Sequence, residues 1–391
     1  MKNKFVDFSN TEIAFAHKSD SELKKSARLF GLMNKKWLVD IASSIGMVAV
    51  RYRFPLVRRL VRYTIFEQFV GGETLQESQD NIDRLWQNKT LTVLDYGAEG
   101  RSDEEDLDEA CEQFLQAVSF AATKESVPVV GIKISALSKN ELLQGKQESS
   151  LTSEQELLYD RAVKRVDDIC KLGHELSVRI FIDAEESWMQ DAIDQIVIAM
   201  MQKYNREQVI VYNTFQMYRH DRYEFLLASH RIAESEGYLL GAKLVRGAYM
   251  EKERDRAEEM GYPSPIHTSK ENTDQDFNRA VQYCLEHYEK LASCTATHNM
   301  ESCLLQANII GERKLPRNHP NLNFCQLYGM SDHITFNLAA NGYNVAKYVV
   351  YGPVEEIVPY LTRRARENTA VEGEFSREYQ LVSEERRRRA I

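Results

Sequence analysis

The sequence predicts an α/β fold in which eight strands alternate with helices, and three observations support this. From residue 91 onward, short β-rich runs alternate with long stretches of helical period. Most of the runs are bounded by turn residues or polar clusters, and nearly every run ends in a polar or charged side chain. Strands separated by helices pair in parallel, and eight of them close most naturally into a (βα)8 barrel.

The chain is expected to divide into a helical region over residues 1–90 and a barrel domain over residues 91–391. In the first region, residues 43–50 are one candidate helix. A second begins near Pro55, which suits a first helical turn, and ends at Gly71 and Gly72. The predicted strands cover residues 91–94, 129–134, 178–182, 209–213, 243–246, 294–297, 323–327 and 343–350. Residues 153–174 and 274–292 are the clearest helices between them.

Composition excludes several classes of protein. The formal net charge of −9 over 391 residues does not fit a nucleic-acid-binding surface, which needs clustered basic residues. The six cysteines contain no C-x-x-C pair, so we expect reduced thiols in a reducing compartment. The N-terminus lacks the apolar core of a signal peptide, and the apolar stretch at residues 41–50 is shorter than the roughly 20 residues that span a bilayer. We therefore expect a cytoplasmic protein, or one peripheral on the inner face of a membrane.

Catalytic residues of such barrels come from the C-terminal ends of the strands. The residues that end the eight predicted strands are Asp95 and Glu99; Lys133; Asp183, Glu185 and Glu186; Asn213 and Gln216; Lys243, Arg246 and Tyr249; Thr297, His298 and Asn299; Gln326; and Lys347, Tyr348 and Tyr351.

Lys133 is the most informative of these residues, because it interrupts an apolar run and burying an unpaired ammonium is costly. Either it serves a ligand, or it only pairs with a carboxylate of the next strand such as Asp183 or Glu185. The same two interpretations apply to Asp183, because a buried, paired carboxylate is common at functional sites without proving one.

Two adjacent arginines, Arg363 and Arg364, lie on a predicted helix about 100° apart, so both can reach one small region. Guanidinium groups suit a bidentate grip on a carboxylate. The alternative is a solvated helix face, which the nearby Arg366 and Glu367 favour. No metal site is predicted, since His267 and His298 lack partners at ligand spacing. There is no G-x-G-x-x-G or phosphate-binding P-loop sequence.

Seven motifs in order resemble the proline dehydrogenase family over residues 90–375. They are IKISAL, FIDAEES, YNTFQMY, KLVRGAYMEKER, ATHN, QLYGM and YLTRRARENT. The resemblance implies a distorted (βα)8 barrel with FAD bound non-covalently at the strand ends. It also implies oxidation of L-proline to 1-pyrroline-5-carboxylate, with electrons passed to a membrane quinone. The NTFQ and YVVYGP segments are similar to the single-function enzymes.

The resemblance also implies roles for individual residues. Lys133, Arg363 and Arg364 would hold the substrate carboxylate, Tyr348 would pack over the proline ring, and Leu244 and Tyr249 would shape the pocket. Glu99 would pair with Arg363, and Asp183 and Lys243 would lie at the reacting centre. The residues around the flavin would be Asp183, Asn213, Lys243, Val245, Arg246, Gly247, Ala248, Thr268, Thr297 and His298.

Two positions depart from the family pattern. Lys243 stands where several bacterial members have arginine, so the bidentate fork is lost there. The LDYGAEG segment differs in spacing from the family's D-L-L-G-E, which affects Glu99.

Other interpretations stay open. The same fold could act on trans-4-hydroxy-L-proline, although the bulky Tyr348 favours an unsubstituted ring. A metal-dependent barrel hydrolase would use Asp183 and His298, and a catalytically silent barrel would act as a scaffold. The segment 55–69 carries Arg58, Arg59 and Arg62 beside an apolar stripe. It is either a peripheral membrane contact or a helix packed on the barrel.

Overall fold

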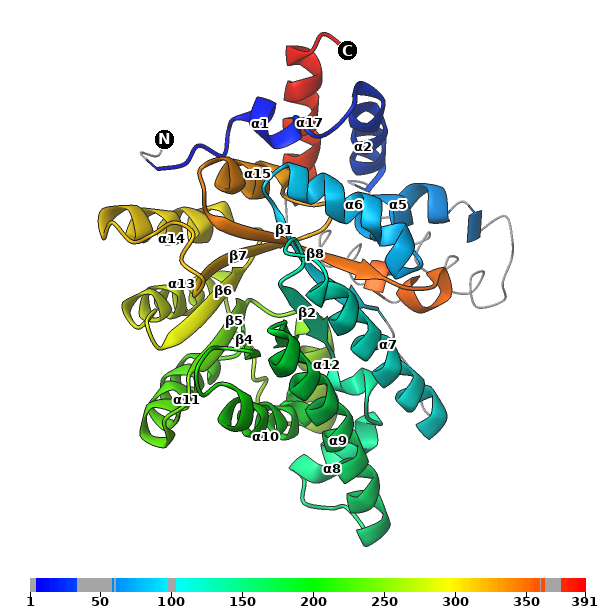
Figure 1. The fold of residues 1–391 in the computed structure, drawn as a ribbon, viewed down its shortest axis with the longest axis vertical. Coiled ribbons are helices and arrows are strands. Elements are labelled where there is room, and N and C mark those ends of the chain that lie inside the picture. Colours follow the sequence, from blue (N-terminus) through cyan, green and yellow to red (C-terminus); the bar gives the residue numbers. More distant parts are fainter. Residues whose placement is uncertain (1–4, 34–57, 60, 98–102, 359, 363–373) are drawn as a thin grey trace. The chain divides into compact units, whose positions relative to one another are not determined.

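The computed structural model describes residues 5–33, 58–59, 61–97, 103–358, 360–362 and 374–391 (Figure 1). The predicted helix at residues 43–50 lies outside this part, as do Glu99, Arg363 and Arg364. The chain divides into two compact units, one of residues 1–99 and 326–391, the other of residues 100–325.

The first unit holds strands β1 (Leu91–Tyr96) and β8 (Asn344–Tyr351), which pair in parallel with Leu91 opposite Ala346. Its helices include α1 (Thr11–Phe15), α2 (Asp20–Met33), α6 (Leu75–Gln87), α15 (Asp332–Ala340) and α17 (Glu374–Arg388). Helix α2 lies beside α17, and α1 packs on α15, so segments from both ends of the chain are packed together (Figure 1).

The second unit alternates strands and helices. Its strands are β2 (Val129–Ile132), β3 (Arg179–Ile182), β4 (Val211–Gln216), β5 (Leu240–Val245), β6 (Leu291–Ala296) and the start of β7 (Leu322–Leu327). The helices between them are α7 (Glu104–Ala122), α8 (Asn140–Gln147), α9 (Ser153–Leu176), α10 (Ser187–Tyr204), α11 (Arg222–Glu236), α12 (Met250–Met260), α13 (Lys270–Glu286) and α14 (Met300–Glu312). All strand pairs are parallel, with Ile132 opposite Ile182 and Ile182 opposite Asn213.

The eight strands follow one another as a closed barrel in the order β1 to β8, which confirms the predicted (βα)8 fold. Each predicted run overlaps one strand. The close approach of β4 and β5 requires a glycine, since a Cβ on Gly241 would meet the Val211 carbonyl oxygen at 2.3 Å.

One predicted helix was too long. Helix α13 ends at Glu286, whereas the prediction extended to residue 292. Leu291 and Ala292 instead begin β6, where they pair with Leu240 and Gly241 of β5. Small and apolar residues fit a helical or an extended period equally well, and here the strand pairing decides between them.

The basic segment after Pro55 is helical at residues 58, 59 and 61, passes through a π-helical turn (Arg62–Phe66) and ends after α5 (Glu67–Phe69). Two of its arginines, Arg58 and Arg62, face carboxylates of the same unit. Arg58 lies 2.7 Å from Glu73 and 3.0 Å from Glu355, and Arg62 lies 3.1 Å from Glu73. These ion pairs favour a packed helix over a free basic surface.

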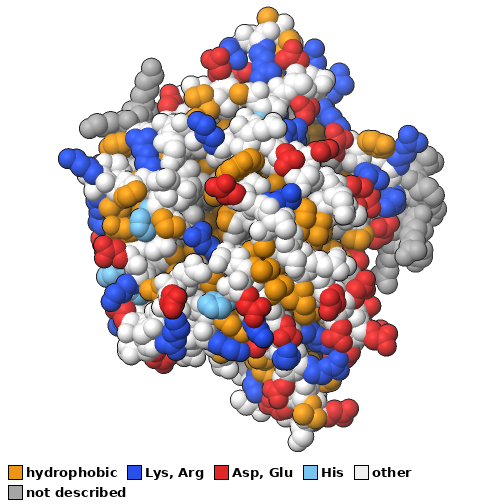
Figure 2. Space-filling model, viewed as in Figure 1, with side chains coloured by type: hydrophobic (Ala, Val, Ile, Leu, Met, Phe, Trp, Pro, Cys, Tyr) orange, Lys and Arg blue, Asp and Glu red, His pale blue; other side chains and the backbone are white. Residues whose placement is uncertain are grey.

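Basic and acidic side chains are mixed on the face shown in Figure 2, with no single basic patch there. Among the described residues, no helix combines the length and the apolar character needed to cross a membrane. All six cysteines are buried free thiols. Burial raises the pKa of the Cys111 thiol to about 11, so this group stays protonated near neutral pH.

Candidate active site

Lys133 follows β2 directly. The strand ends at Ile132, and Lys133 precedes the short 3-10 turn of residues Ile134–Ala136. The predicted strand of residues 129–134 was therefore two residues too long, and Lys133 follows the strand instead of interrupting it. Its side chain is half-buried at the strand end, where residues of such barrels meet ligands.

Asp183 and Lys243 form an ion pair across the ends of β3 and β5. The Lys243 Nζ donates a hydrogen bond to Asp183 Oδ1, and the Lys243 side chain is only 7% exposed. The same ammonium lies 5.7 Å from the centre of the Phe181 ring. A buried lysine needs such a partner, because desolvating an unpaired charge is expensive.

Glu185, two residues beyond Asp183, is 3% exposed, and its Oε1 accepts a hydrogen bond of 2.9 Å from the Ser135 N–H. Its own backbone N–H donates to Gln190 Oε1 at 2.7 Å. Gln190 in turn donates to Asp194, which also binds Arg222 at 2.6 Å. This chain of bonds fixes the backbone that carries Glu185.

Arg246 is held by side chains from three neighbouring elements. Its Nε donates to Asp274 at 2.8 Å, its Nη1 to Thr297 at 2.7 Å and its Nη2 to Ser302 at 3.1 Å. Although burial alone would raise it, the bonds and charges of Lys270 and Arg246 lower the pKa of Asp274. The guanidinium also stacks 4.3 Å from the centre of the Phe277 ring, so it is a fixed positive charge just beyond β5.

The turn after β5 needs a glycine. Gly247 has φ +137°, and a Cβ there would meet the Tyr218 ring at 2.5 Å. The glycine lets the backbone pass close to the Tyr218 ring, while the residue itself stays exposed. Val245, Ala248 and Tyr249 around it are partly exposed, Leu244 is fully buried, and Thr268 is exposed.

The end of β6 presents Thr297 and His298. Thr297 Oγ1 accepts both from Arg246 and from the Asn299 N–H, the latter at 3.1 Å. Asn299 caps α14 by accepting from the Ser302 N–H at 3.0 Å. His298 is partly exposed beside this cap.

The two amides of β4 differ in their surroundings. Asn213 donates to Asp194 of α10 at 2.9 Å and accepts from the Thr214 N–H at 2.8 Å. Its place in a cofactor site therefore stays a prediction. Gln216 is 2% exposed, and its buried Oε1 has no hydrogen-bond partner among the described residues. A buried acceptor without a donor points to a ligand N–H. Gln216 stood among the predicted strand-end residues but was not assigned a role.

In the first unit, Tyr348 lies on β8 and is 5% exposed, and its backbone oxygen accepts from the Tyr328 N–H at 2.9 Å. Residues 354–358 and 360–362 are helical, which agrees with the start of the predicted arginine helix. Among the described residues, no group of three or more His, Cys, Asp or Glu side chains could hold a metal ion.

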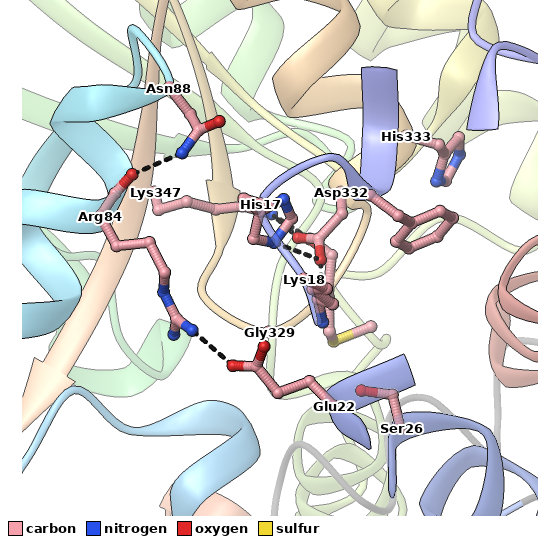
Figure 3. A network of polar contacts seen from close by, with 12 residues as sticks. His17, Lys18, Glu22, Ser26, Arg84, Asn88, Gly329, Asp332, His333 and Lys347 are labelled. Atoms are coloured by element: carbon pink, nitrogen blue, oxygen red, sulfur yellow. Dashed lines mark hydrogen bonds and ion pairs between the residues drawn. The ribbon is translucent and has the colours of Figure 1, made fainter. Parts of the chain in front are cut away.

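A second buried cluster of the first unit, the Asp332 cluster, contains His17, Lys18, Asp332 and Lys347 (Figure 3) and is completed by Glu378. Lys347, with no exposed surface, lies 2.9 Å from Asp332, and its Nζ also donates to the Met330 carbonyl. Lys18 lies 3.2 Å from the other Asp332 oxygen. Although burial alone would raise it, the charges of Lys347 and Lys18 hold the pKa of Asp332 well below its usual range.

Glu378 of α17 borders this cluster. It accepts a hydrogen bond of 2.8 Å from the Ser331 N–H, and burial together with the charge of Asp332 raises its pKa to about 7. The cluster thus joins β8, α15, α17 and the segment before α2. These contacts place it among the structural supports of the unit.

The fold and these strand ends define a class of protein, an α/β-barrel enzyme whose site is rich in fixed cations and paired carboxylates. The proline dehydrogenase family model matches residues 78–377, so the chain belongs to the proline dehydrogenase family. This confirms the family, and with it the predicted enzyme class, an oxidoreductase.

Several relatives agree with this assignment. The chain is 30% identical over 433 residues to proline dehydrogenase 2, mitochondrial, of Arabidopsis thaliana, covering 99% of this chain and 91% of that protein. It is 33% identical over 324 residues to the carbapenem antibiotics biosynthesis protein CarD of Pectobacterium carotovorum subsp. carotovorum, covering 83% and 84%. It is 40% identical over 238 residues to human proline dehydrogenase 1, mitochondrial, covering 60% of this chain and 40% of that protein.

The fold is shared with proline utilization A from Bdellovibrio bacteriovorus inactivated by N-propargylglycine. The TM-score is 0.76 at 19% identity, over 95% of this chain and 44% of the other. The chain thus matches less than half the length of that protein and of the human relative.

Proposed function

We propose that the protein oxidises L-proline to 1-pyrroline-5-carboxylate with FAD as the hydride acceptor. The observation that carries this proposal is the buried Asp183–Lys243 ion pair at the strand ends. Lys133 and Arg246 belong to the sequence motifs that resemble the family. Fixed charges of this kind orient a charged amino acid without reorganisation during the reaction.

The residues present fit a flavin. Gln216 offers a buried acceptor for an imide-type N–H, and Gly247, just after β5, is exposed and carries no side chain. Arg246 supplies a fixed cation suited to anionic parts of a dinucleotide. Bound here, FAD would supply the electron-pair acceptor. The cofactor-binding set would be Asp183, Asn213, Lys243, Val245, Arg246, Gly247, Ala248, Thr268, Thr297 and His298, with Gln216 added.

The substrate would be held through its carboxylate by Lys133, Arg363 and Arg364. Tyr348, Leu244 and Tyr249 would bound the ring, and Glu99 would pair with Arg363. Three cations for one carboxylate would fix the substrate at one end and so restrict the orientation of its ring. Such positioning lowers the barrier by several kcal/mol.

The experiment that tests this function is the absorption spectrum of the purified protein. We expect a flavin spectrum, from bound or added FAD, that is bleached by anaerobic L-proline. trans-4-Hydroxy-L-proline should bleach it more slowly, because the bulky Tyr348 leaves little room for a ring substituent. A protein that binds no FAD would contradict the proposal, and faster bleaching by hydroxyproline would favour the alternative substrate.

Two alternative functions have less support. A metal-dependent hydrolase would need Asp183 as a ligand, but this carboxylate accepts a hydrogen bond from the Lys243 ammonium, which would repel a metal ion. A silent scaffold would have no use for the buried charges of the strand ends, which are costly without a function. Metal analysis of the same preparation separates the hydrolase from the flavoprotein.

We also propose that a membrane quinone accepts the electrons, through a peripheral membrane contact. The paired arginines of the basic segment make it a poor contact, since Arg58 and Arg62 already face carboxylates. We expect the variant with Arg58, Arg59 and Arg62 changed to glutamine to sediment with anionic vesicles as the unchanged protein does. A clear loss of vesicle binding would instead assign the contact to this helix, since each free basic residue near anionic lipid contributes about 1 kcal/mol.

A further inference from the structure

A buried carboxylate joins two of the connections that follow the barrel strands. Glu253, in the first turn of α12, has no exposed surface. Its Oε1 accepts a hydrogen bond of 2.6 Å from the Ser187 N–H, and its Oε2 accepts one of 2.5 Å from the Ser187 hydroxyl. Ser187 is the first residue of α10, which follows β3. Two charge-assisted hydrogen bonds therefore tie the start of α12 to the start of α10.

The first turn of α12 has a second contact at the same place. The Lys252 ammonium lies 2.6 Å from Glu186, the residue before Ser187. The Lys252 side chain is 66% exposed, so this ion pair contributes little to holding the turn. Glu253 is therefore the main anchor of the turn.

The anchored turn begins at Tyr249, which the proposed function places at the wall of the substrate pocket. The Tyr249 backbone oxygen accepts the Glu253 N–H at 2.9 Å, so the two residues belong to the same helical turn. The other end of the connection between β5 and α12 is held differently, because Arg246 donates to three side chains of other elements. Loss of the Glu253 anchor should thus displace Tyr249 and leave Arg246 in place.

We propose that Glu253 is a positioning residue, which holds Tyr249 against the ring of the substrate through its bonds to Ser187. This inference rests on the proposed function, because Tyr249 must line the ring pocket for the anchor to affect binding. The alternative is that Glu253 only caps α10, whose N-cap residue Glu186 makes no side-chain capping bond. A cap would support every ligand of the region equally, whereas a positioning residue would act on the ring alone.

The test compares two carboxylates that have no amine to oxidise. Cyclopentanecarboxylate has a five-membered ring, as proline does, and acetate has no ring. Their dissociation constants are measured from the change in the flavin absorption spectrum of the FAD-loaded protein. In Glu253→Met, which keeps much of the volume but removes both acceptor oxygens, we expect cyclopentanecarboxylate to bind about 10-fold more weakly, which equals about 1.4 kcal/mol. Acetate binding and the FAD dissociation constant should stay unchanged.

Four further variants sharpen the comparison. Glu253→Gln should restore tight binding, because its amide can accept the Ser187 N–H and donate to the Ser187 hydroxyl. Glu251→Met is the matched control, since it removes an exposed carboxylate from the same turn. In a protein that already carries Tyr249→Ala, Glu253→Met should add little further loss. Ser187→Ala removes one of the two bonds, and should give a smaller loss of the same kind even if Glu253→Met does not fold.

The outcomes separate this inference from the proposed function. Equal weakening of both carboxylates in Glu253→Met, no weakening of either, or the same loss in Glu251→Met overturns the role of Glu253. A full additional loss beside Tyr249→Ala, or Ser187→Ala without a selective loss, overturns it as well. If the unchanged protein binds FAD but not cyclopentanecarboxylate, the proposed substrate site is wrong, and the inference falls with it.

Discussion

Changing Asp332 to asparagine is expected to lower the free energy of unfolding by about 3–5 kcal/mol, the cost of breaking a buried ion pair from one side. Lys347 has no exposed surface and lies 2.9 Å from Asp332 (Figure 3). Asparagine keeps the shape and one acceptor oxygen, but the ammoniums of Lys347 and Lys18 lose the carboxylate that compensates them. The measurement is the denaturant midpoint and slope, with the same excess of FAD for every variant.

The double variant with Asp332→Asn and Lys347→Met distinguishes the charge effect from general damage. Removing the stranded ammonium should recover a large part of the loss, because a buried pair replaced as a whole often costs little. Asp168→Asn is the surface control. It removes an exposed carboxylate that pairs with Lys164 four residues earlier, and should change stability by about 0.5 kcal/mol or less. An Asp332→Asn loss no larger than this would show that the cluster does not support the fold.

The barrel could be predicted because its signals are local. Each β-rich run between polar boundaries became a strand, since the buried faces of parallel strands demand continuous apolar residues. The polar residues after those runs could also be predicted as functional candidates, because the carboxyl ends of parallel strands meet on one side of a barrel. Strand bounds were wrong by a few residues, as at the end of β2 and at Leu291, where a helical and an extended period both fit.

The pairing of the charged residues could not be predicted to the same extent. The sequence leaves the partner of Asp183 open, because its pairing with Lys243 of β5 depends on how the strand ends meet. Gln216 becomes a candidate only through a buried oxygen without a donor, which has no sequence signal. A polar residue at the end of a β-rich run is a candidate site residue. The contacts around it in the structure then decide whether it is available to a ligand.

The Asp332 cluster had no signal beyond Lys347 itself, which stands in the apolar run VAKYVVY. Its members lie far apart in the sequence. They come from residues 17 and 18, from α15 and β8, and from α17. Contacts between such distant segments depend on the complete fold. A lysine inside an apolar strand predicts a buried partner without indicating which one.

The second large effect is expected at the arginines that follow the last barrel strand. Arg363→Met and Arg364→Met should each raise the KM for L-proline about 10- to 150-fold, because charge-assisted bonds to a carboxylate are worth roughly 1.5–3 kcal/mol each. Flavin content should stay mostly intact, since these residues are assigned to the substrate and not to the cofactor. The measurement is steady-state oxidation with an artificial electron acceptor, together with the flavin-to-protein ratio of each variant.

Arg366→Met is the matched control, because it removes the same charge from the same predicted helix at a position without an assigned role. The helical residues 354–358 and 360–362 lead directly toward these arginines. If the arginines bind the carboxylate, the KM effect is confined to Arg363 and Arg364, and cyclopentanecarboxylate inhibition weakens in parallel. Equal and small changes in all three variants would mean that the arginines form a solvated helix face, and the substrate carboxylate would then depend on Lys133 alone.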